Sequence, residues 1–204
     1  LNYNLYIYFI FSFLPISHIL GNTMLNGNII LCNIVLLIYS IKNRDWNWIK
    51  NDFFKWLLIL YFYLIFNSLY SILFKIDHEH VQGGFLRSLG FIKYVIFTFS
   101  FYALIKLNIK IDKIIKVWFL IILIVIVDVF FKKYFGKNLI GNVSPNHTRI
   151  VSFFKDELVV GNFVLLYGFM TFFYLVSKNN LKFKNIAFIN IFLLILIITI
   201  FFSG

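Results

Sequence analysis

Seven apolar stretches, each close to 20 residues long, limit what this chain can fold into. A helix rises 1.5 Å per residue, so about 20 apolar residues cross the roughly 30 Å hydrocarbon layer of a membrane. Strands of transmembrane barrels are shorter and alternate in polarity, unlike these unbroken runs. The sequence therefore predicts an all-α fold, a polytopic transmembrane helix bundle. The expected spans are 3–20, 24–41, 56–74, 88–106, 114–131, 158–177 and 186–203.

Composition excludes a soluble globular domain. The chain is 61% hydrophobic and 13% charged, whereas soluble domains have roughly 45–50% apolar and about 25% charged residues. The net charge of +11 is divided among loops between apolar runs, which favours a membrane surface over nucleic acid as partner. The lone Cys32 excludes a disulfide framework. We expect one integral membrane domain over 1–204, truncated at both ends, because the chain begins at Leu1 and stops just after an apolar run.

Basic residues concentrate in alternate loops. The linkers 42–55, 106–116 and 178–184 hold 11 of the 19 lysines and arginines. Because cytoplasmic loops of membrane proteins are enriched in these residues, we place the three linkers in the cytoplasm. The Leu1 side is then cytoplasmic as well, and we expect the protein to cross the membrane several times.

The long outer loop at 132–157 departs from this charge bias. It carries five cations on the side where cations are disfavoured: Lys132, Lys133, Lys137, Arg149 and Lys155. One interpretation is that the first three only extend along the end of the preceding helix towards water. That does not account for Arg149, far from the helix end, and connections of this length are usually functional or disordered. The loop is too apolar for disorder, so we expect it to fold back onto the outer membrane face.

Three charged residues lie inside or near the outer ends of spans, where charge is costly and marks function. These are Arg87, Lys93 and Asp128. One interpretation is an Asp128–Lys93 ion pair that holds two helices together. The other is a cationic recess at the outer leaflet, in which Asp128 orients the cations.

Arg149 is our first candidate for a functional residue. A guanidinium binds phosphate through two parallel hydrogen bonds and stays charged at any relevant pH. Fixed cations also stabilise the charge that a diphosphate leaving group develops. The structural alternative is that Arg149 pairs with Asp156 or Glu157 to hold the loop, and both roles are compatible.

The histidines give weaker indications. His78 and His80 form a His-x-His pair without the other ligands of a familiar metal site, so no metal is predicted. His147 lies two residues before Arg149 and has the chemistry of a general base, although a lone loop histidine is more often only solvated.

Three segments resemble one family. RSLGFIKYVIF at 87–97, VDVFFKKYFGKNLIGN at 127–142 and RIVSFFKDELVVGNF at 149–163 are similar to the bacterial O-antigen ligase/polymerase family of polytopic membrane proteins. The terminal FFSG resembles the start of that family's next motif. One departure is Lys93, where the family commonly has arginine.

The resemblance implies a metal-independent, cofactor-free glycosyltransferase with the membrane fold of lipid-donor glycosyltransferases. The donor would be a glycan on undecaprenyl diphosphate. The acceptor would be lipid A–core for a ligase, or a second lipid-linked repeat unit for a polymerase. Arg149 matches the family's diphosphate-binding arginine, and we expect Arg87, Lys93, Lys137, Lys155 and Asp156 to bind substrate around it. The family's catalytic histidine lies in a later loop, beyond Gly204. From another class, a transporter or flippase of lipid-linked saccharides would have its site at the bilayer midplane.

Overall fold

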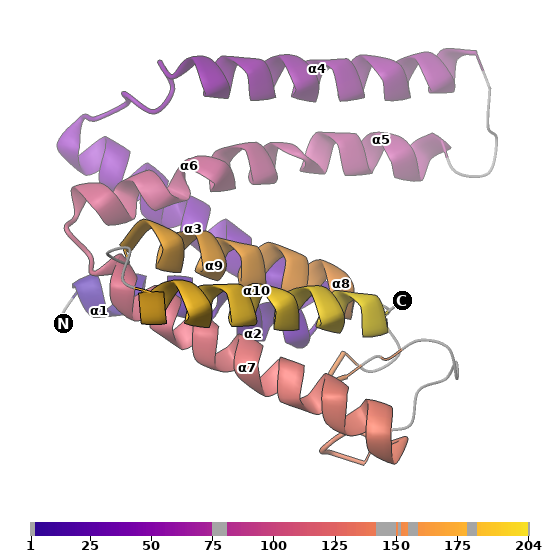
Figure 1. The fold of residues 1–204 in the computed structure, drawn as a ribbon. Helices are drawn as coiled ribbons and strands as arrows, with labels where there is room; N and C mark the ends of the chain where they lie inside the picture. The colour runs from indigo at the N-terminus through magenta and orange to yellow at the C-terminus, as the bar shows by residue number, and fades with distance from the viewer. Residues whose placement is uncertain are drawn as a thin grey trace. The chain divides into compact units, whose positions relative to one another are not determined.

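A computed structural model describes residues 3–74, 81–141, 150, 152–154, 159–178 and 183–203, and this part of the chain is all-helical (Figure 1). Six of its helical segments are long and apolar enough to cross a membrane. The predicted fold class is therefore confirmed as a membrane-type helical protein. These segments are Asn22–Asn43, Asp52–Leu73, Gly83–Lys106, Ile111–Phe135, Val160–Lys178 and Ile186–Ser203.

The first expected span, 3–20, is replaced by two short helices, α1 (Tyr3–Ser12) and α2 (Leu14–Ile19). Pro15 explains the break, because it has no N–H to donate to the carbonyl of Phe11, four residues earlier. The indole Nε1 of Trp118 donates to that oxygen at 3.0 Å. The side chain of Trp118 is buried, so it satisfies a carbonyl that a continuous helix would have satisfied itself.

The helices cluster in two compact units. Unit 1 comprises residues 1–10 and 26–109, and unit 2 comprises residues 11–25 and 110–204. Each unit is described below by itself.

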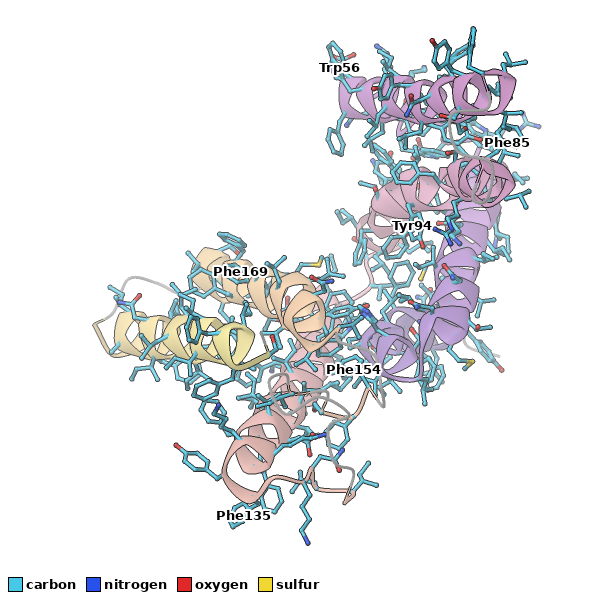
Figure 2. All side chains as sticks on the ribbon, turned by 90° about the vertical axis from the view of Figure 1, so that its right-hand side faces the viewer. Trp56, Phe85, Tyr94, Phe135, Phe154 and Phe169 are labelled. Carbon is cyan, nitrogen blue, oxygen red and sulfur yellow. The ribbon has the colours of Figure 1, made fainter. Side chains whose placement is uncertain are left out.

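Unit 1 contains most of α3 (Asn22–Asn43), with α4 (Asp52–Leu73), α5 (Val81–Gly90) and α6 (Ile92–Lys106). Helix α4 runs alongside α5 and α6 (Figure 1). Its only buried side chain is Phe54, and apolar side chains such as Trp56 stand out around it (Figure 2). In water this surface would be a liability, but it suits a helix surrounded by lipid.

The loop between α3 and α4 is tied to α6 through Asp45. Its carboxylate accepts hydrogen bonds from the hydroxyls of Tyr39 at 3.0 Å and Tyr102 at 2.9 Å, and from the backbone N–H of Asn47 at 3.2 Å. Chiefly through the Asn47 N–H, and also through the two hydroxyls, these bonds hold the pKa of Asp45 below its usual range.

Unit 2 contains α7 (Ile111–Phe135), α8 (Val160–Phe163), the π-helical turn η1 (Val164–Gly168), α9 (Phe169–Lys178) and α10 (Phe183–Ser203). The run α8–η1–α9 forms one span with a widened turn inside it, and α10 packs along it (Figure 1). Two glycines allow this close approach. A Cβ at Gly161 would lie 2.8 Å from Ser203 Oγ, and one at Gly168 would lie 2.7 Å from Leu196 Cδ2.

Candidate functional site

The candidate site lies at the C-terminal end of α7, where Asp128 and Lys132 are one helical turn apart. Residues four apart share a face of a helix. Asp128 is fully buried and Lys132 is 4% exposed. The helix then ends at Gly136, whose φ of +74° is the left-handed conformation that glycine adopts without strain. Two buried groups of opposite charge are thus fixed at the last turns of one helix.

The carboxylate of Asp128 holds the two ends of the segment that follows α7. One oxygen accepts the backbone N–H of Leu139 at 2.7 Å, and the other accepts the hydroxyl of Ser152 at 2.6 Å. The side chain of Asn138 donates to the carbonyl of Ser152 at 3.0 Å. Both ends of the intervening segment are therefore attached to α7 and to each other.

Ser152 adopts an uncommon backbone conformation for this role. Its φ is +47°, in the region that a non-glycine residue enters only when its surroundings compensate. It is fully buried, and its hydroxyl and carbonyl are held by Asp128 and Asn138. The hydrogen bonds made by its hydroxyl and its carbonyl offset the energetic cost of this backbone conformation.

Lys132 is the buried charged group of this site that could bind an anion. Within the described part of the chain, its ammonium makes no hydrogen bond although the side chain is buried. The nearby charge of Asp128 partly offsets its own. A buried ammonium without hydrogen-bond acceptors is costly, so an anion reaching this position would gain from it.

A second anchor holds the 152–154 segment through aromatic contacts. The His18 ring lies edge-to-face against Phe154, Phe163 and Tyr167, with centroid distances of 6.1, 5.6 and 5.8 Å. Figure 2 shows Phe154 within the packed side chains of unit 2. The hydroxyl of Tyr167 donates to the carbonyl of Leu14 at 3.3 Å. The segment is thereby joined to α2 and to the π-helical turn.

The predicted site residues of unit 2 are only partly described. Asp128 accepts hydrogen bonds from Leu139 and Ser152, and its predicted role of orienting cations stays a prediction. Lys137 is exposed, one residue beyond Gly136. The remaining predicted members of this loop lie outside the described residues: His147, Arg149, Lys155, Asp156 and Glu157.

One interpretation needs correction. Lys132 was grouped with lysines that extend to water at the end of a helix, but its side chain is buried. The signal that would have found it is the spacing of four residues from Asp128, which pairs the two on one helix face. Lys133 does stay exposed, with its ammonium 5.2 Å from the centre of the Phe202 ring.

Arg87 and Lys93 belong to unit 1. Arg87 is exposed on α5, and Lys93 is half-buried on α6 with its ammonium 5.0 Å from the centre of the Tyr94 ring. The carbonyl of Lys93 accepts the side-chain amide of Asn33 at 2.8 Å, and Tyr94 donates to Asn26 at 3.1 Å. Lys93 thus lies at a polar contact between α3 and α6, to which Asn26 and Asn33 of α3 contribute.

No cluster of His, Cys, Asp and Glu suited to a metal ion occurs among the described residues. His78 and His80 lie outside them, so the predicted absence of a metal stays a prediction. No protein-family model, curated protein or solved structure matches this chain.

Proposed function

We propose that this chain is part of a membrane glycosyltransferase resembling the O-antigen ligases. It would transfer a glycan from undecaprenyl diphosphate to lipid A–core or a related lipid acceptor, at the periplasmic face of the bacterial inner membrane. The observation that supports this most is the attachment of both ends of the 139–152 segment to Asp128.

That attachment matters because it joins two of the three segments that carry the family resemblance. One contains Asp128 and the other contains Arg149, three residues before Ser152. In the proposal this attachment would position Arg149, because a preorganised cation stabilises developing charge without reorganisation. Arg149 is therefore our proposed ligand of the donor diphosphate.

The other charged residues differ in burial and in position. Lys132 contributes a buried positive charge and Lys137 an exposed one at the same end of α7. Together with Arg149, these lysines would neutralise a diphosphate that carries more than one negative charge. Lys155 and Asp156, which follow Arg149 in the sequence, and Arg87 and Lys93 of unit 1 stay predicted substrate-binding residues.

The proposed orientation rests on the distribution of basic residues. The basic linkers 42–55, 106–116 and 178–184 would be cytoplasmic, and the end of α7 with the residues that follow it periplasmic. The cytoplasmic placement of Leu1 further requires α1 and α2 to cross the membrane together as a broken pair. Single-cysteine labelling at position 149, in a Cys32→Ala background, tests this orientation. Labelling by cytoplasmic reagent alone would invert it.

A repeat-unit polymerase remains the alternative within the family, and a saccharide transporter or flippase is the alternative from another class. The π-helical turn Val164–Gly168 favours the transporter, because interrupted helices line transport sites. Against this, Gly161 and Gly168 both lie against α10, so close helix packing already accounts for them.

Purified full-length protein with lipid-linked donor distinguishes these functions. A ligase forms product only when acceptor lipid is added, and a polymerase extends the donor alone. A transporter moves the donor across vesicles and leaves the glycan–diphosphate bond intact. Donor that is neither transferred nor elongated, but translocated, would contradict the proposed function.

A further inference from the structure

A cavity of about 360 Å³ opens at the other end of unit 2, between the start of α7 and the end of α9. Its inner wall is apolar and includes Ile115, Phe119 and Leu175. Phe119 packs against Phe192 of α10, with ring centroids 5.3 Å apart, so the wall is backed by a third helix. The volume lies within the range of small-molecule sites, roughly 300–1,000 Å³.

The rim of this cavity is charged. Asp112 accepts the hydroxyl of Tyr174 and forms an ion pair with Lys178. Its negative charge is thus compensated by groups of the protein. Lys116 also lines the cavity and makes no ion pair within the described residues. Its exposed ammonium is available for an anion at the mouth of an apolar slot.

This combination fits a lipid better than a soluble anion. Among the described residues that line the cavity, Thr171 is the buried polar one, and its hydroxyl already donates its proton to the carbonyl of Tyr167 at 2.8 Å, so it has no proton left to donate to a sugar or nucleotide. Lys116 lies near the ends of the helices, where lipid headgroups lie. The apolar wall of the cavity extends along two apolar spans, α7 and the span that ends with α9. Basic pockets between transmembrane helices are the usual sites of anionic headgroups.

We infer that the cavity between α7 and α9 is a binding site for an anionic phospholipid. The headgroup phosphate contacts Lys116, with Lys178 beside it, and one acyl chain lies on Phe119 and Leu175. This site is separate from the proposed diphosphate site and does not depend on the proposed function.

Binding of defined lipids to the detergent-purified protein tests the inference, with native mass spectrometry as readout. Phosphatidylglycerol is compared with phosphatidylcholine carrying the same acyl chains. We expect tighter binding of phosphatidylglycerol, and loss of about fivefold in its affinity in Lys116→Gln, as one interfacial lysine contributes. Leu175→Trp, which fills the slot, should weaken binding of both lipids.

Lys50→Gln is the matched control, because Lys50 is an exposed loop lysine outside the cavity and should leave both affinities unchanged. Equal binding of the two lipids would overturn the inference, as would equal effects of Lys116→Gln and Lys50→Gln. Lipid binding that survives Leu175→Trp in a protein of unchanged melting temperature would place the lipid elsewhere.

Discussion

The hydroxyl of Ser152 donates a 2.6 Å hydrogen bond to the buried carboxylate of Asp128, 24 residues earlier in the chain. This contact, with the one from Leu139 N–H to the same carboxylate, fixes both ends of the segment that contains Arg149. A buried carboxylate beside a buried lysine therefore has a positioning role as well as an electrostatic one.

Removing this carboxylate should be costly. Asp128→Ala leaves a buried ammonium at Lys132 uncompensated and breaks both hydrogen bonds, a loss of about 3–5 kcal/mol in the free energy of unfolding. Unfolding of the detergent-purified protein by denaturant measures it. Asp128→Asn also removes the charge of Asp128. Adding Lys132→Met to this variant should restore part of the lost stability, because it removes the buried, uncompensated ammonium. Equal stability of the Asp128→Asn single and double variants would show that the two charges are not coupled.

The break between α1 and α2 gives a second prediction. Trp118→Phe leaves the carbonyl of Phe11 without its indole donor and should cost about 1–3 kcal/mol. Pro15→Ala restores an N–H four residues after Phe11, so the double variant should lose less than Trp118→Phe alone. A double-mutant cycle of unfolding free energies checks this. Strictly additive losses would mean that Pro15 does not explain the indole contact.

A third prediction concerns the close contact between Gly168 of the π-helical turn and Leu196 of α10. Gly168→Ala places a Cβ 2.7 Å from Leu196 Cδ2, and Leu196 is fully buried with little room to move. We expect a loss of about 1–3 kcal/mol from overpacking, relieved in part by Leu196→Val. Gly27→Ala is the control, since nothing lies near that position, and replacing a helical glycine there should if anything stabilise. Comparable melting temperatures for Gly168→Ala and Gly27→Ala would contradict the packing.

A pH dependence follows from Asp45. Its pKa in the folded protein is lowered, first by the Asn47 N–H, so it binds protons less readily folded than unfolded. Its stabilising contribution is therefore full above the unfolded pKa of about 3.9 and is lost as pH falls through the folded value. Melting temperatures measured from about pH 6 downwards should fall less steeply in Asp45→Asn than in the unmodified protein. Parallel curves would exclude this role of Asp45.

Apolar composition and length could predict the spans because each is a local property of the sequence. Six of the seven expected spans coincide with long apolar helices to within a few residues. The stretch 3–20 forms two short helices instead of one long one, because Pro15 interrupts it, and the compensating donor, Trp118, lies 107 residues away. Such a partner depends on tertiary packing and leaves no local mark.

The candidate site was predictable to a similar extent. Asp128 stood out because a carboxylate near the end of a span is rare. Its partner Ser152 did not, since an ordinary serine gains its role only when the backbone returns to α7 with a φ of +47°. The burial of Lys132 likewise depends on the chain folding over it, although its spacing from Asp128 was visible.

The central claim of the proposed function is that Arg149 binds the donor diphosphate. Glycan transfer from undecaprenyl-diphosphate-linked donor, by full-length protein, tests it most directly. The account predicts that Arg149→Ala and Arg149→Lys abolish transfer while membrane insertion is retained, and that the loop variant Lys50→Ala transfers normally. Full transfer activity in Arg149→Ala would contradict it.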